Sequence, residues 1–363
     1  MLVEVNFFLG FSLAPGVGPK GFQKLIRLFG SAQSAWNGSP SDFKKAGVGK
    51  VNFAKFDEFR KTFDSREYLN KLRKARVEFI EYGDKYYPHH LTKIDSPPIG
   101  LFTRGNKKLL IEQNVIAVVG ARKITSYGRL VTESLVSELS ARGFIIASGM
   151  ALGVDGVAHL STIENNGATI AVLGCGVDCP YPRENEKLYE EILDSGGLII
   201  SEFPLGMPAN RGTFPSRNRI IAGISQAVLI TEAAADSGSL ITAGEAIKQG
   251  KTVFAVPGPI TSQMSHGTLK LLKQGAVLVA SASDILESLN IKNKILNIKN
   301  THKIPNISRV ERRLLEILEN EDQTIDEISK LTKITISELS ISLSEMEIKG
   351  MVINNGGKFS VIR

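Results

Sequence analysis

Seven short apolar runs, separated by stretches with helical periodicity, constrain the fold of this chain more than any other feature. Each run has four to six residues and is nearly all apolar, as expected for strands that are buried on both faces of a parallel sheet. Residues 115–290 therefore predict a doubly wound α/β domain. The predicted strands are Val115–Val119, Phe144–Ala147, Ala168–Leu173, Leu198–Ser201, Ala227–Ile230, Thr252–Val256 and Ala276–Val279.

Glycines and arginines stand where these strands end, and ligands bind at that edge of such a sheet. Glycine lets a ligand approach the backbone, and a Ser-Gly-Ser turn before a helix offers N–H and hydroxyl donors to an anion. Arginine binds phosphate in a bidentate manner and stacks on bases. The residues of this predicted anion site are Gly120, Arg122, Gly149, Gly176 and Arg183, then Arg211, Phe214, Arg217, Asn218 and Arg219 in a loop leading into a helix, and Ser237, Gly238 and Ser239.

The distribution of charge agrees with a local site. Residues 115–290 hold 13 basic and 16 acidic side chains, so arginines that gather at one rim stand out against an acidic background. Residues 1–110 hold 19 basic and 10 acidic side chains, net +9, whereas residues 111–363 are net −2. The surplus suggests a polyanion partner for part of the chain, and a solvated basic face without a partner is the alternative.

Two nucleotide-binding motifs are incomplete. Gly120-Ala121-Arg122-Lys123 follows the first predicted strand, but the Gly-x-Gly-x-x-Gly spacing of a dinucleotide-binding turn is missing. The segment from Gly244 to Gly250-Lys251-Thr252 has one residue too many for a Walker A loop, and it precedes a strand instead of following one. We therefore expect no cofactor.

No set of side chains forms a convincing catalytic group. His159 lies in a predicted helix and is interpreted as a packed or capping histidine. Glu202 and Glu232 end strands, where each is open to two interpretations, a general base or a partner of backbone donors. Cys175 is a candidate for a position near a helix N-terminus, which lowers a thiol pKa, but no histidine is evident near it. Cys175 and Cys179 lack the second pair of ligands that a zinc site needs, so we expect no metal and no catalytic residue.

Residues 1–80 lack strand-like alternation and predict a domain of short helices. The turns at Gly16-Val17-Gly18 and Gly47-Val48-Gly49 are typical of a tandem helix–hairpin–helix or SAM-like module. Backbone N–H groups at such turns can hold a DNA phosphate. Lys20, Lys24 and Lys50 are the predicted auxiliary contacts, and a helical packing module without a ligand is the alternative.

The C-terminal part of the chain predicts a linker and a third domain. Residues 291–306 are rich in Lys and Asn and have no apolar period. Residues 307–363 predict three helices and a hairpin, the pattern of a winged helix, with Thr324 and Glu327 as a capping box. This domain holds 8 basic and 10 acidic residues, which favours a protein contact over DNA binding. The remaining residues, 81–290, form the predicted central domain.

The cellular setting follows from the cysteines and the apolar stretches. Two cysteines cannot form a disulfide framework, which is typical of a cytoplasmic protein. Glu4 precedes the first apolar stretch and no Lys or Arg does, which argues against a signal peptide. No run approaches the roughly 20 apolar residues of a membrane span, so we expect no membrane partner.

Several strings in the α/β region are specific when they are taken in this order and spacing. The sequence resembles the bacterial DNA-processing protein A family, also called Smf, over nearly its whole length. The strings that carry the resemblance are Tyr87-Pro88 with Leu91, Val119-Gly120-Ala121-Arg122, Tyr127-Gly128, Ser148-Gly149-Met150-Ala151, Gly153-Val154-Asp155, Ala158-His159, Val172-Leu173-Gly174-Cys175-Gly176-Val177-Asp178, Tyr181-Pro182-Arg183-Glu184-Asn185, Ser201-Glu202-Phe203-Pro204, Phe214-Pro215-Ser216-Arg217-Asn218-Arg219, Ser237-Gly238-Ser239-Leu240 and Ala255-Val256-Pro257-Gly258.

The resemblance implies an extended Rossmann-like domain between a SAM-like domain and a winged helix. It implies a homodimer that binds single-stranded DNA without sequence preference, protects it, and loads the RecA recombinase in natural transformation. Arg122 is then the phosphate contact, Arg183 and Arg211 extend the positive track, and Phe214 offers a stacking face. Arg217, Asn218 and Arg219 shape the pocket. All of the predicted anion-site residues become predicted DNA contacts.

Two departures from the family pattern weaken parts of this expectation. Leu152 replaces a residue that is often basic, and Thr268 directly follows Gly267 where Gly-x-Asn is common. A second candidate function is a nucleotide phosphoribohydrolase-like enzyme, because Ser237-Gly238-Ser239 followed by Glu245 distantly resembles its loop and glutamate. A third is a scaffold that bridges partners without DNA. The dimer surface is left open between Ile220–Ile224 and Leu240–Ile247.

Overall fold

The structure is a computed structural model that divides into two units, Met1–Leu296 and Asn297–Arg363, each considered by itself. The predicted linker at 291–306 lies outside the described residues. The predicted boundary at residue 80 falls inside the first strand, and the four domain ranges stay predictions. The described residues are 2–290, 309–318, 322–332, 334–348, 351–355 and 357–361.

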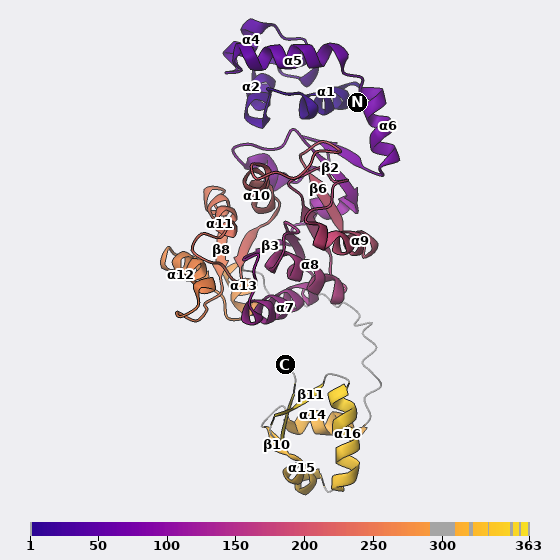
Figure 1. Ribbon diagram of the computed structural model, residues 1–363, viewed down its shortest axis with the longest axis vertical. Helices are drawn as coiled ribbons and strands as arrows, with labels where there is room; N and C mark the ends of the chain where they lie inside the picture. The colour runs from indigo at the N-terminus through magenta and orange to yellow at the C-terminus, as the bar shows by residue number, and fades with distance from the viewer. Residues whose placement is uncertain are drawn as a thin grey trace. The chain divides into compact units, whose positions relative to one another are not determined.

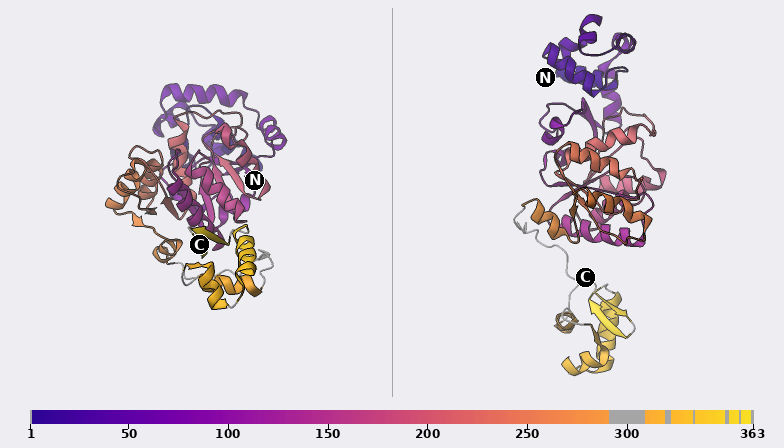
Figure 2. Two further views of the ribbon diagram at one scale, coloured as in Figure 1. Left: turned by 60° about the horizontal axis from the view of Figure 1, so that its bottom comes forward. Right: turned by 90° about the vertical axis from the view of Figure 1, so that its left-hand side faces the viewer.

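Short helices form the N-terminal part of the first unit, as predicted, and Figure 2 shows them gathered in one cluster. Aromatic rings fill their core, with the rings of Phe11 and Phe56 stacked at 5.2 Å. Gly16 and Gly47 take positive φ values of 85° and 82° in the two turns. The helices are α1 (Leu2–Leu13), α2 (Pro19–Phe29), α3 (Ala32–Trp36), α4 (Pro40–Lys45), α5 (Lys50–Thr62) and α6 (Ser65–Lys74).

A nine-stranded sheet of order β1-β2-β6-β5-β4-β3-β7-β8-β9 forms the centre of the first unit (Figure 1). β1 and β2 are antiparallel additions at one edge, and the seven predicted strands form the parallel part. Each predicted strand is found within two residues of its predicted ends. The strands are β1 (Glu78–Glu81), β2 (Gly100–Gly105), β3 (Val115–Val119), β4 (Ile145–Ser148), β5 (Thr169–Val172), β6 (Leu198–Ser201), β7 (Ala227–Ile230), β8 (Thr252–Ala255) and β9 (Val277–Leu278).

Helices cover both faces of this sheet, which explains why its strands are apolar throughout. Along β3, Ile116 and Val118 belong to one buried cluster, and Val115, Ala117 and Val119 belong to another. The helices are α7 (Ser126–Ala141), α8 (Val154–Glu164), α9 (Glu186–Asp194), α10 (Thr213–Ile224), α11 (Ser239–Lys248), α12 (His266–Lys273) and α13 (Ala282–Ser288), and the short 3₁₀ turns are η1 (His89–Lys93), η2 (Lys107–Ile111), η3 (Arg183–Asn185) and η4 (Gln263–Ser265).

Helix α10 corrects one sequence-based expectation. Phe214 to Arg219 were predicted in a loop leading into a helix, but α10 already begins at Thr213. The same helix buries Ile220 and Ile221 in the sheet core, so that part of the Ile220–Ile224 alternative is interior and not a dimer surface. In α11, Ile241 and Ile247 are exposed.

The second unit is the predicted winged helix, three helices and a small sheet of order β10-β12-β11. The predicted capping box is present, because Thr324 N donates to Glu327 Oε2 at 2.7 Å and Glu327 N donates to Thr324 Oγ1 at 3.3 Å. Its elements are α14 (Arg309–Leu318), α15 (Ile325–Thr332), α16 (Ile336–Ile348), β10 (Gln323–Thr324), β11 (Val352–Asn355) and β12 (Lys358–Val361). Across the described residues of both units, no helix has the length and apolar character to cross a membrane.

Candidate nucleic-acid interface

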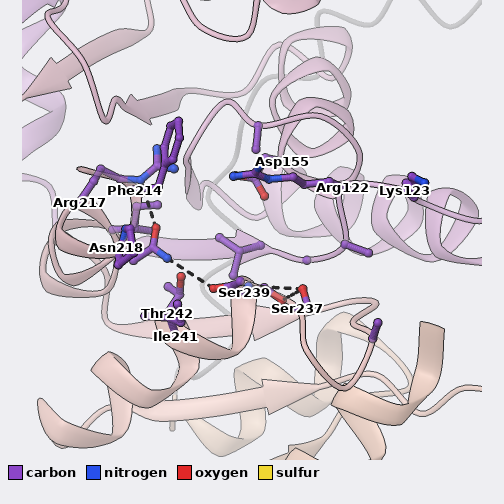
Figure 3. Close-up of a pocket in the computed structure, with 18 of the residues that line it drawn as sticks. Arg122, Lys123, Asp155, Phe214, Arg217, Asn218, Ser237, Ser239, Ile241 and Thr242 are labelled. Carbon is purple, nitrogen blue, oxygen red and sulfur yellow. Dashed lines mark hydrogen bonds between the residues drawn. The ribbon is translucent and has the colours of Figure 1, made fainter. Parts of the chain in front are cut away.

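A pocket of about 750 Å³ opens at the carboxyl ends of the parallel strands. It lies where β3 and β7 are neighbours, and the chain leaves β3 towards β4 but leaves β7 towards β8. This point, where the strand order reverses, is the usual ligand site of a doubly wound sheet. The loops after β3 and β7 and the first turns of α10 and α11 form its walls (Figure 3).

The loop after β3 is held by Glu232 at the end of β7. Ala121 N donates to the Glu232 carbonyl at 2.7 Å, and Thr125 donates to the carboxylate through N at 2.9 Å and Oγ1 at 2.6 Å. A Cβ at Gly120 would lie 2.6 Å from the Glu232 carbonyl oxygen, so only glycine fits this close approach. Of the two interpretations left open for Glu232, the partner of backbone donors is the one found.

Arg122 and Phe214 combine a positive charge with an aromatic face. The Arg122 guanidinium carbon lies 5.4 Å from the centre of the Phe214 ring, and the Tyr181 ring lies 5.5 Å from Phe214 on centroids. Arg122, Lys123 and Arg211 are exposed, and none of them has an ion-pair partner among the described residues. The pocket therefore offers unneutralised cations beside a stacking platform, a combination that suits a nucleotide chain.

Arg217 is buried beneath this platform and organises it. Its exposed fraction is 4%, and its Nη1 donates to the carbonyls of Gly149, at 2.7 Å, and Val172. A Cβ at Gly149 would meet the guanidinium at 2.5 Å. Burial lowers the pKa of Arg217 to about 10, against the opposing charge of the buried Asp155, so the side chain stays charged at neutral pH. Burial raises the pKa of Asp155, which accepts Gly149 N at 3.1 Å.

Polar donors line the wall opposite Arg122. The hydroxyls of Ser237 and Ser239 lie 2.8 Å apart, and Asn218 Nδ2 donates to the Gly238 carbonyl at 3.5 Å (Figure 3). Gly238 is the N-cap of α11, and the first-turn N–H groups of Ser239, Leu240 and Ile241 already donate to Ser237 and Gly238. The donors that this turn offers to an anion, beside the exposed cations, are therefore the hydroxyls of Ser237 and Ser239.

The structure separates several predicted contacts from the pocket. Arg219 pairs with Glu202 at 2.5 Å, with an exposed fraction of 13%, and lines a different cavity. Gly176 serves a close packing of loops, because a Cβ there would lie 2.5 Å from the Pro204 carbonyl. Arg183 is exposed in η3 but does not line the pocket. The three lysines of the N-terminal helices, Lys20, Lys24 and Lys50, are exposed and also lie outside it.

Other residues line the pocket although sequence reasoning did not assign them to it. Lys123 and Tyr181 stand beside predicted contacts, so their positions in the chain were a usable signal. Ile241, Thr242 and Met264 carried no signal, because apolar or small side chains in α11 and η4 have the pattern of ordinary core. Leu152, where the family often has a basic residue, lines a smaller adjoining cavity of about 70 Å³.

The histidine and the cysteine that were considered for catalysis are buried in the core. His159 is fully buried with Nδ1 2.6 Å from Thr169 Oγ1, and burial lowers its pKa to about 3. The expectation of a lowered thiol pKa at Cys175 is wrong, because burial raises it to about 12. Glu245 is bound to Lys248 at 2.7 Å and lines another cavity than Ser237. The Ser-Gly-Ser turn and this glutamate therefore do not form one site.

Comparisons with known proteins assign the family. A sequence profile described as DNA recombination-mediator protein A matches residues 78–290, and one described as the DprA winged helix domain matches residues 300–358. The chain belongs to the DNA-processing protein A family. This confirms the resemblance read from the sequence, and it confirms the Rossmann-like sheet with an added winged helix.

Individual relatives cover most of the chain. The protein Smf of Synechocystis is 33% identical over an alignment of 389 positions, gaps included, which covers 98% of each chain. DNA-processing protein A of Streptococcus pneumoniae has a crystal structure with a TM-score of 0.69 and 32% identity, covering 78% of this chain and 97% of that one. The Helicobacter pylori protein, described by its single-stranded DNA binding mode, has a TM-score of 0.54 and 32% identity, covering 59% and 96%.

Proposed function

We propose that this protein binds single-stranded DNA without sequence preference in the pocket between β3 and β7. The observation that carries the proposal is the pairing of exposed Arg122 with the Phe214 ring, opposite the donor turn at Ser237–Ser239. Phosphates suit the cations and the donors, and any base suits the ring, since every base has a stacking face. The single-strand binding described for the Helicobacter pylori relative supports this assignment.

The finer part of the proposal concerns the fate of the strand once it is held. The bound strand is protected and passed to the RecA recombinase during natural transformation, by a homodimer that acts in the cytoplasm. The family description as a recombination mediator supports a role in recombination. The exposed Ile247 on α11 supports the α11 face as the dimer surface. The protein acts as a non-catalytic binding protein, and the separation of Glu245 from Ser237 disfavours the phosphoribohydrolase alternative.

Two single variants test the pocket. We expect Arg122→Ala to weaken binding of a labelled poly-thymidine strand roughly 10- to 100-fold, because a charge-assisted contact contributes about 1.5–3 kcal/mol. Phe214→Ala removes stacking of about 1–3 kcal/mol per base, and Phe214→Tyr should restore it. Fluorescence anisotropy gives the affinities, and circular dichroism confirms that each variant is folded.

Arg129→Ala is the matched control, because Arg129 lies on α7 outside the pocket and pairs with Glu133 at 3.4 Å. It should bind like the wild-type protein. Unchanged affinity in the folded Arg122→Ala and Phe214→Ala variants would refute the pocket assignment. The recombination role is tested by measuring RecA filament assembly with and without the protein. If variants that no longer bind the strand still changed this assembly, the recombination role would not depend on DNA binding.

A further inference from the structure

A second cavity, of about 300 Å³, borders the DNA pocket on the far side of α10. Three parts of the first unit form it: α2 with Lys20, the loop that begins at Lys93, and the helices α10 and α11 with Arg219 and Lys248. Pro215, on the first turn of α10, lines both cavities. The two spaces therefore adjoin at this exposed residue.

Four basic side chains line this second cavity, against two acidic ones, Asp95 and Glu245. Lys20 and Lys93 are exposed, and neither has an ion-pair partner in the described part of the chain. Lys248 is bound to Glu245, and Arg219 is bound to Glu202. The Nη1 atom of Arg219 nevertheless has no hydrogen-bond partner among the described residues, so one buried donor is unsatisfied.

A continuous polyanion explains both cavities with one ligand. A small anion would fill either space alone, but it would not account for a shared wall at Pro215 with free cations on both sides, Arg122 on one and Lys20 on the other. An acidic protein segment would not use the stacking face at Phe214.

We infer that a DNA strand held in the pocket crosses Pro215 and continues through the second cavity, where Lys20 and Lys93 contact its phosphates. The inference rests on the proposed single-strand binding and adds a path and a footprint to it. The N-terminal helices then take part in binding through Lys20 only when the strand is long enough to leave the pocket. Short strands that fill the pocket alone do not reach these lysines.

The experiment compares strand lengths in the full-length protein. The double variant Lys20→Ala, Lys93→Ala is titrated with thymidine oligomers of about 4 and about 16 nucleotides, which span the usual range of single-strand sites. We expect roughly 10-fold weaker binding of the long strand at low salt and unchanged binding of the short one. The salt slope for the long strand should fall by about 1.4, because each single-strand phosphate contact contributes about 0.7.

A matched control removes two lysines from elsewhere in the basic region. Lys74 and Lys108 are exposed, have no ion-pair partner among the described residues, and line neither cavity. The variant Lys74→Ala, Lys108→Ala has the same net charge as the test variant and should keep the wild-type slope.

Three results would overturn the inference. Equally weakened binding of short and long strands would show that the two lysines act on the DNA held in the pocket and not on a continued path. Equal effects of the test and control variants would mean that only total charge matters. Wild-type affinity for both lengths would show that the strand does not pass Lys20 and Lys93. A wild-type protein that binds neither strand would instead refute the proposed function itself.

Discussion

The N-terminal helices and the α/β domain use charge in opposite ways. Residues 1–110 carry a net charge of +9, and Lys20, Lys24 and Lys50 among them are exposed to solvent. Residues 115–290 hold more acidic than basic side chains, yet the pocket that suits a nucleic acid lies there. Under the proposed function, the position of a few cations, fixed by their surroundings, determines the site more than the total charge does.

The fixed positions depend on buried polar groups beneath the pocket. Arg217 donates to two backbone carbonyls at the ends of β4 and β5, which ties those strand ends to α10. Such a network is costly when one member is removed, because the partners are left buried without hydrogen bonds. Solvated lysines on the N-terminal helices lack this coupling. The two regions should therefore respond very differently to substitution.

The largest expected effect is that of Arg217→Ala on folding. The variant leaves the buried carbonyls of Gly149 and Val172 without their donor, which costs about 1–3 kcal/mol for each group, and it removes the positive charge that lowers the pKa of Asp155. We expect the α/β domain to unfold at lower urea concentration, and strand binding to be lost with it. Arg129→Ala, an exposed arginine in the same domain, should change the free energy of unfolding by no more than about 0.5 kcal/mol.

The contrast between the two regions would be wrong if Arg217→Ala unfolded at the same urea concentration as the wild-type protein. Arg217 would then be a dispensable side chain, and its burial would carry no organising role. Arg217→Lys is the informative intermediate. It keeps the charge but cannot reproduce the guanidinium fork, so we expect it to restore only part of the stability.

The second effect is a dependence of stability on pH that belongs to His159. Thr169 Oγ1 donates to the Ile146 carbonyl at 2.7 Å, so it accepts from His159 Nδ1. The buried Nε2 has no hydrogen-bond partner among the residues that the structure describes. Burial lowers the pKa of His159 to about 3, from 6.5 in the unfolded chain. Because the unfolded state then binds the extra proton, stability is complete above pH 6.5 and falls as the pH falls towards 3.

Between pH 6.5 and pH 5, His159 by itself should lower the free energy of unfolding, measured by urea denaturation, by about 2 kcal/mol, since each pH unit in this window contributes about 1.4 kcal/mol. The raised pKa values of the buried Asp155 and Glu202 act in the opposite direction, so the comparison with His159→Leu isolates this contribution. His159→Leu should reduce this slope, because the side chain no longer titrates. The smaller shift of His90, whose pKa burial also lowers, should remain. Residues 1–80 contain no histidine, so no histidine of the N-terminal helices contributes to the slope. A slope unchanged by His159→Leu would contradict its assignment to His159.

The same contrast shows which parts of the fold and of the pocket could be predicted from the sequence. The strands were predictable because burial on both faces makes them continuous apolar runs, and the turn glycines because Gly16 and Gly47 need positive φ. Gly120, Arg122 and Ser237–Ser239 were predictable as pocket residues because carboxyl ends of parallel strands share one edge. These features follow from local patterns and from general rules of topology.

The roles within α10 were not predictable from the order of residues. Successive side chains on a helix point about 100° apart, so three adjacent residues face three environments. Arg217 enters the core, Asn218 lines the pocket and Arg219 turns to the second cavity. The sequence places all three together, and only the helix that begins at Thr213 separates them.

The smallest expected effect tests the auxiliary lysines that line neither cavity. Lys24 and Lys50 are exposed at the two N-terminal turns, and Lys24 Nζ lies 3.4 Å from where a Cβ at Gly47 would be. If their charge acts only at long range, Lys24→Ala with Lys50→Ala should weaken strand binding about twofold in dilute buffer. The effect should vanish near 0.15 M salt, where the screening length is about 8 Å.

Anisotropy titrations across a salt series make this measurement, with Arg122→Ala as the reference for a direct contact. A loss that persists at about 0.15 M salt would show that the N-terminal turns hold phosphates themselves, through their free N–H groups and lysines. Charge in the two regions would then act alike, by contact. A loss confined to dilute buffer would mean that the strand is contacted directly only by the α/β pocket and by the path past Lys20. Lys24 and Lys50 would then act through a long-range attraction that raises the rate of encounter.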